Sequence, residues 1–189
     1  MKYRTELLCA IVLCLPAALA AGEKSDPELA REATAAFAGS LKSELMSAMQ
    51  SGGPLAAIEV CNTRAPEIAK TVSLEKGMEV SRVSLKNRNP DNAPTDWQQS
   101  VLEDFDARKM AGEDPTSIAW QDVAKLESGR EYRFMKAIPT GGLCLQCHGE
   151  TLDPAVAGKI EELYPDDKAT GYKAGDIRGA FVVTRKVSP

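Results

Sequence analysis

Several features are scarce in this sequence, and each scarcity excludes a class of protein. Histidine occurs only once, at His148, so no site that needs two imidazoles from one chain can form. Lysine and arginine form no basic run and the net charge is −4, which argues against binding to a nucleic-acid backbone. No long apolar run follows residue 20, so we expect no membrane span in the remaining chain.

The first 20 residues have the organisation of a secretory signal peptide. Two basic residues near the start precede an apolar run over 7–15, and Ala18-Leu19-Ala20 gives the small-x-small pattern of a cleavage site. We therefore predict export to the periplasm and cleavage near Ala20. The remaining residues, 21–189, are enough for one domain with its own core.

Cysteine is also scarce once the signal peptide is set aside. Of the five cysteines, Cys9 and Cys14 lie in that segment, and Cys61, Cys144 and Cys147 remain. An odd number of thiols in an oxidising compartment leaves at least one that does not pair within the chain. Such a thiol is a hazard unless it is buried or bound.

Hydrophobic periodicity places helices first and strands mostly afterwards. Because neighbouring strands mostly pair with each other, the order predicts an α+β fold with an antiparallel sheet. The expected helices run from Ser25 to Gly52, from Pro54 to Gly77 with a bend or restart at Pro66, from a capping box at Thr95 to Gly112, and from Asp153 to Tyr164; the expected strands lie at 78–86, at 119–138 as two strands around a turn, and at 179–187.

The single histidine ends the sequence CLQCH, residues 144–148. This spacing is that of covalent haem attachment, in which two thiols add across the porphyrin vinyl groups and the histidine binds the iron from the same side. Haem attachment of this kind takes place outside the cytoplasm, in agreement with the predicted export. The motif therefore predicts one haem c, held by Cys144 and Cys147, with His148 as the proximal ligand.

Two other sites remain compatible with these residues. A thioredoxin-type dithiol would need C-x-x-C at a helix start within a βαβ pattern, which the sequence does not show. A zinc site could take Cys61 together with Cys144, Cys147 and His148, but zinc motifs usually consist of two separated ligand pairs. Here the second pair is missing, so haem is the preferred interpretation.

The second axial ligand of such a haem cannot be another histidine of this chain. Methionine is the common partner, but all six methionines precede the motif, the reverse of the usual order in small carrier cytochromes. Cys61 is a better candidate, although it fits equally well as a small buried apolar side chain. A thiolate would favour ferric iron and a low potential, and reduction would weaken the bond. Pro66 would help the segment move.

Four stretches in a fixed order give a more specific signal: VCNTRAPEIA, RVSLKNRNPDNAP, CLQCHG and GYKAGDIRGAF. They resemble a family of exported or membrane-tethered c-type haem domains with a PAS-like fold, over about residues 30–187. The resemblance implies that Cys144 and Cys147 carry the haem, that His148 is one axial ligand and that Cys61 is the other.

Three functions are compatible with these features. Some relatives carry the domain on histidine kinases or chemoreceptors, which implies redox or diatomic-gas sensing; this chain shows no transducer, so a separate transducer or redox partner would be needed. The alternative is a periplasmic electron-transfer cytochrome c whose acidic surface docks a basic partner. A haem enzyme such as a peroxidase would need a distal base, and without a second histidine we predict no enzyme.

Other residues of the four stretches have simpler interpretations. Arg82 and Arg178 are candidates for pairing with haem propionates, and a solvated or salt-bridged arginine is the alternative. Asn89 is expected to shape a loop near the haem. Gly175 is expected to make a turn, and Gly179 to let two backbones pack closely.

Overall fold

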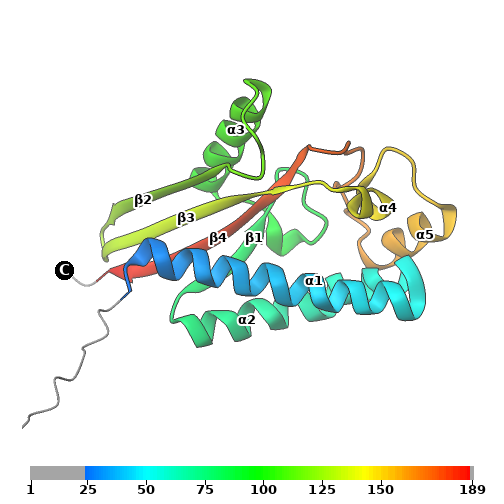
Figure 1. Cartoon of the computed structure of the whole chain (residues 1–189), viewed down its shortest axis with the longest axis horizontal. Helices are drawn as coiled ribbons and strands as arrows, with labels where there is room; N and C mark the ends of the chain where they lie inside the picture. Colours follow the sequence, from blue (N-terminus) through cyan, green and yellow to red (C-terminus); the bar gives the residue numbers. More distant parts are fainter. Residues whose placement is uncertain (1–23, 188–189) are drawn as a thin grey trace, which may run out of the picture.

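The computed structural model describes residues 24–187, and the predicted signal peptide, residues 1–20, lies outside them. Helix α1 spans Asp26–Glu59, but the chain reverses within it at Gly53, where φ is 68° and ψ is −161°. It continues through a π-helical turn, Val60–Arg64, into α2, Ala65–Lys76, which runs back beside α1 (Figure 1). The predicted break at Gly52-Gly53 is confirmed.

Within the described residues, four antiparallel strands form one sheet in the order β1-β4-β3-β2. The last strand along the chain, β4, is therefore a central strand. The edge strand β1 is shorter than the predicted 78–86, because the backbone N–H of Ser84 turns away to donate to the carbonyl of Asn92. The strands are β1 (Glu79–Val83), β2 (Ala119–Leu126), β3 (Gly129–Pro139) and β4 (Ile177–Val187).

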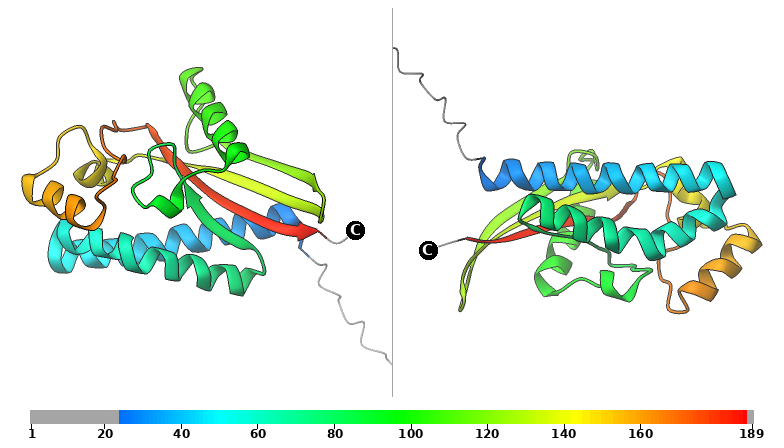
Figure 2. Two further views of the ribbon diagram at one scale, coloured as in Figure 1. Left: turned by 180° about the vertical axis from the view of Figure 1, so that it is seen from behind. Right: turned by 90° about the horizontal axis from the view of Figure 1, so that it is seen from below.

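Helices cover both faces of this sheet (Figure 2). The α1–α2 hairpin packs on one face through an apolar cluster that includes Phe37 and Phe134. Helix α3, Asp96–Met110, packs on the other face through a cluster that includes Phe105 and Met135. The capping box at Thr95 that opens α3 is confirmed.

A third apolar cluster lies beyond the end of the sheet. Ile58, close to the reversal of the hairpin, packs with Val156, Ile160 and Tyr164 of the α5 region, and Cys147 contacts the cluster. The short helix α4 (Leu145–His148) and α5 (Pro154–Leu163) therefore meet the reversing end of the hairpin (Figure 1).

The predicted α+β class is confirmed, with a long N-terminal helix and an antiparallel sheet flanked by helices. Within residues 24–187, no helix combines the length and the apolar character that crossing a membrane requires.

Candidate functional site

The CLQCH segment folds as one short helical turn. A 3-10 turn, Gly142–Cys144, leads into α4, and the N–H of Gly149 closes the turn on the carbonyl of Leu145 at 3.0 Å. Residues three apart lie on the same side of a helical turn, so Cys144 and Cys147 are directed alike. Both thiols are half-buried, and neither forms a disulfide with another cysteine of residues 24–187.

The imidazole of His148 is held in one tautomer. Its Nδ1 lies 2.7 Å from the carbonyl oxygen of Ala169, and because a carbonyl only accepts, Nδ1 carries the hydrogen and donates it. Burial, followed by the charges of Arg178 and Arg88, lowers the pKa of His148 to about 2. The ring is therefore neutral with Nε2 unprotonated, which is the form that binds a metal.

Backbone contacts from a later segment hold the same ring in place. The N–H of Tyr172 donates to the carbonyl of His148 at 3.0 Å, and the N–H of Gly171 donates to that of Gly149 at 2.9 Å. The ring of Tyr172 stands edge-on to the imidazole, with the centroids 6.3 Å apart. The loop that follows α5 thus fixes the orientation of the histidine.

Arg88 connects this loop to the thiol-bearing helix. Its guanidinium contacts the Asp167 carboxylate at two points, 2.9 and 3.2 Å, and donates to the carbonyl of Cys147 at 2.6 Å. The carboxylate also accepts from the N–H of Ala169 at 2.9 Å, next to the carbonyl that orients His148. Both charged side chains are only 10% exposed. Sequence reasoning missed this pair, although Arg88 lies within one of the four family-like stretches.

Cys61 lies in the π-helical turn between α1 and α2. The N–H of Ala65 donates to the carbonyl of Val60, five residues back, and Pro66 has no N–H with which to continue the regular pattern. The proline thus accounts for the wide turn, and the predicted bend at Pro66 is confirmed as this irregularity. Single π-helical turns frequently occur at functional sites.

All four predicted site residues border one largely apolar cavity. It encloses about 610 Å³, including space open to solvent, and Cys61 enters it from the hairpin while Cys144, Cys147 and His148 enter it from α4. The remaining lining residues are Leu41, Leu45, Met49, Ala57, Ile58, Arg82, Arg88, Leu143 and Arg178.

The donors surround this space and do not converge on a point. Among residues 24–187, no three His, Cys, Asp or Glu side chains are grouped closely enough to hold a metal ion. Zinc coordinated by Cys61, Cys144, Cys147 and His148 therefore does not fit, and a planar cofactor with its own metal does. Burial raises the pKa of the Cys147 thiol, so it is protonated.

One methionine competes with Cys61 for a place opposite His148. Met49 of α1 borders the same cavity, whereas Met78 and Met135 are buried in the two sheet cores and Met110 is exposed. Position alone does not separate Met49 from Cys61, but the two sulfurs differ in charge and would give different spectra.

The two predicted arginines also reach the cavity. Arg82 and Arg178 line it, and no salt bridge of either is present in the described part of the chain. Burial, with the nearby Arg178 charge, lowers the pKa of Arg82. The Asn89 side chain accepts from the N–H of Asp91, which is the loop-shaping role predicted for it.

The family model described as Tll0287-like matches residues 20–185. The chain belongs to the Tll0287-like family. Among solved structures it is similar to that of the cyanobacterial heme-protein Tll0287, with 25% sequence identity and a TM-score of 0.62. That match covers 86% of this chain and 97% of the other. No curated protein matches the sequence. The expected resemblance is confirmed in part, as membership of the Tll0287-like family with a heme protein as structural relative. The PAS-like fold, the covalent attachment and the axial ligand pair that the resemblance implied stay predictions.

Proposed function

We propose that this Tll0287-like chain is an exported protein with a single covalent haem c. The observation that carries the proposal is that Cys144, Cys147, His148 and Cys61 border one largely apolar cavity without converging on a metal point. The similar solved protein is described as a heme protein, which is the same class of cofactor. We place the protein in the periplasm and assign it no catalytic activity.

Each residue has a chemical role that its surroundings support. Cys144 and Cys147 would each add S–H across one vinyl double bond, and His148 would present Nε2 to the iron while Ala169 holds Nδ1–H. Arg88 keeps the Cys147 carbonyl and the Asp167–Ala169 loop together, so the imidazole of His148 and the two thiols keep their relative positions. Bound there, the haem would supply a redox centre whose iron also binds diatomic gases.

Cys61 is the residue that makes this a sensor proposal. Its thiolate would stabilise the ferric state, and on reduction the sulfur would take a proton and leave. The π-helical turn would then be free to tighten. Arg64, the last residue of that turn, contacts Glu44 of α1 and Glu67 of α2, so a change at Cys61 reaches the surface of the hairpin. A separate transducer protein would detect the change there.

Absorption spectra of the purified exported protein, oxidised and then reduced, test the proposal. We expect pigment that resists acid acetone, low-spin thiolate features in the ferric state, and loss of those features in Cys61→Ala. Met49→Leu serves as the matched control and should leave the ferric spectrum unchanged. Colourless protein would refute the haem assignment, and a Cys61→Ala spectrum identical to wild type would refute the ligand assignment alone.

A second function, electron transfer, is favoured by one surface feature. Leu143 precedes the haem-attachment pair, borders the cavity and is 38% exposed, which gives an apolar contact beside the proposed redox centre. Fast reversible electron exchange with a partner cytochrome, without any spectral sign of ligand change, would favour this function over sensing.

A further inference from the structure

Every charged side chain that lines the cavity, or the smaller cavity that adjoins it, is positive. Arg82, Arg88 and Arg178 border both, and Lys86 borders the adjoining one. Neither lining includes an aspartate or glutamate, although the chain has 27 acidic residues. Charged side chains are rarely buried without a partner. The lining therefore suits a ligand that brings negative charge with it.

Across residues 24–187, two of the three arginines have no carboxylate partner of the kind that neutralises Arg88. Arg88 is neutralised by Asp167, but within the described residues neither Arg82 nor Arg178 has a salt bridge or a side-chain hydrogen bond. The Nε of Arg178 is fully buried and unpartnered. Both arginines are half-buried, and a guanidinium partly withdrawn from water without a partner is costly, so a partner from outside the chain would stabilise it.

A β-bulge sets the position of Arg178. Ile138 of β3 pairs with Gly179 of β4, and the next residue, Pro139, pairs with Ile177. Arg178 is therefore the extra residue of the bulge and faces no partner on β3. Bulges of this kind redirect a side chain at the end of a strand pairing.

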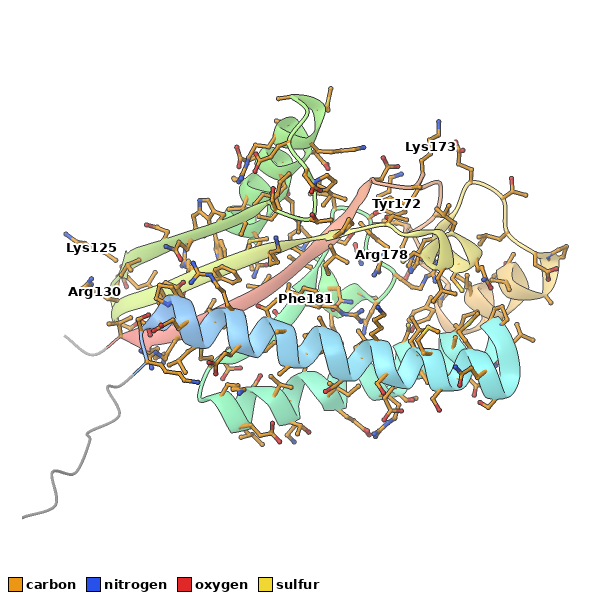
Figure 3. The ribbon with its side chains drawn as sticks, in the orientation of Figure 1. Lys125, Arg130, Tyr172, Lys173, Arg178 and Phe181 are labelled. Atoms are coloured by element: carbon orange, nitrogen blue, oxygen red, sulfur yellow. The ribbon has the colours of Figure 1, made fainter. Side chains whose placement is uncertain are left out.

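The bulge also decides which face of the sheet Arg178 occupies. Ala180 and Ile177 both pack in the apolar cluster under α3, and strict alternation would have placed residue 178 on that face with Ala180. The extra residue sends Arg178 to the hairpin face instead. Arg82 of β1 lies on that same face, with its guanidinium 5.7 Å from the ring centroid of Phe37. Figure 3 shows Arg178 near the start of β4.

Close backbone packing fixes this arrangement. A Cβ on Gly179 would lie 2.3 Å from the carbonyl oxygen of Val83, so only glycine allows β1 and β4 to approach this closely. The hydroxyl of Ser84 donates to the carbonyl of Arg178 at 2.7 Å. The expected role of Gly179 in close packing is confirmed, and it holds the two arginine-bearing strands together.

We infer that Arg82 and Arg178 form a carboxylate-binding subsite that takes the propionates of the haem. This inference rests on the haem assignment proposed above. A planar guanidinium fork matches a carboxylate in charge and geometry, and such pairs are short and strong where water is excluded. The cavity would thus recognise haem by its carboxylates as well as by its reactive vinyl groups.

The test compares haem with its dimethyl ester, which keeps the porphyrin and the iron but has no carboxylate charge. In the mature chain carrying Cys144→Ala and Cys147→Ala, binding is reversible, and we expect haem to bind at least tenfold more tightly than the ester. Arg82→Gln with Arg178→Gln should remove that preference. Arg130→Gln is the matched control, because Arg130 lies at the far end of the sheet (Figure 3).

A second measurement uses the covalently loaded protein. Loss of a positive charge near the iron disfavours the reduced state, so Arg82→Gln and Arg178→Gln should each lower the reduction potential, and Arg130→Gln should leave it unchanged. Should the double variant fail to fold, Arg178→Lys replaces it; this change keeps the charge but loses the fork, and we expect a reduced preference for haem over the ester.

The outcomes separate this inference from the proposed function. Suppose that the wild type carries covalent haem, but the double cysteine variant with both arginines present binds haem and the ester equally. That result would overturn the subsite and leave the haem assignment intact. Wild-type protein without covalent haem would overturn the assignment itself.

Discussion

The two faces of the sheet are closed in different ways. Under α3, side chains such as Phe105 and Met135 fill the interface and none is exposed. Under the helical hairpin, Phe37 and Phe134 do the same at one end, but toward α4 the same face carries Arg82 and borders a cavity. Under α3 the buried contacts are apolar and serve stability, and a charged group that stacks there, Arg133, has its guanidinium 4.6 Å from the ring centroid of Trp97. The hairpin face, which changes to charged and sulfur-bearing side chains toward α4, carries the candidate site.

The largest expected effect is the loss of covalently bound pigment, which depends on residues that border the cavity and not on the α3 face. Replacing both Cys144 and Cys147 with alanine removes the thiols that would form the thioether bonds, so all pigment should become extractable with acid acetone. Phe105→Ala, on the α3 face, should leave the pigment covalently attached. Covalent pigment in the double cysteine variant would show that haem is attached elsewhere.

Phe105→Ala should instead produce the largest loss of stability. Phe105 is fully buried between α3 and the sheet, and truncating such a ring costs about 3–5 kcal/mol. Urea unfolding followed by circular dichroism measures this change. A loss below about 1 kcal/mol would mean that the α3 interface closes around the deletion, contrary to the dense packing described here.

Asp167→Asn tests the polar support of the cavity. The substitution keeps the shape of the side chain but leaves Arg88 without its charged partner. A hydrogen bond to a charged group contributes about 1.5–3 kcal/mol to the free energy of unfolding. We expect a smaller stability loss than for Phe105→Ala together with a changed His148 environment, seen as a shift of the ferric absorption bands. Glu162→Gln on the exposed surface of α5 is the control.

Alkaline pH should weaken the cavity region through Tyr164. Burial, followed by the nearby Cys61, raises the pKa of Tyr164 from 10.0 to about 12. The contribution of Tyr164 to the free energy of unfolding is therefore fully present below pH 10. It is lost as the pH rises from 10 to 12, at about 1.4 kcal/mol per pH unit. Urea unfolding of wild type and Tyr164→Phe across this range should show a shallower decline in the variant. If the free energy of unfolding falls equally in both proteins, the raised pKa of Tyr164 is contradicted.

The smallest expected effect concerns Met49. Leucine has a similar volume, so Met49→Leu should change stability by less than about 1.5 kcal/mol and should leave the ferric spectrum unchanged. A spectral change as large as that of Cys61→Ala would make Met49 the axial ligand and would remove the basis for a thiolate-linked sensor.

Local features of the fold were predictable from the sequence because their causes are local. The reversal at Gly53 follows from adjacent glycines and a proline, and the capping box at Thr95 from residues three apart. The CLQCH motif at 144–148 is likewise contiguous, and the structure places it on one helical turn.

Features that depend on distant residues were not predictable in this way. Arg88 and Asp167 are 79 residues apart, and Asp167 lies in a turn-rich stretch without any motif of its own. The direction of Arg178 depends on a bulge, which is a property of how β4 registers with β3. A single sequence carries no signal for either, because both arise only when the sheet has formed.

The central place of β4 has a consequence for the order in which the molecule is completed. It is the last described strand to leave the ribosome, yet the apolar clusters on both faces of the sheet include its side chains. A chain halted before Ile177 would leave β1 and β3 with no strand between them, so neither face of the sheet can close before β4 has been synthesised.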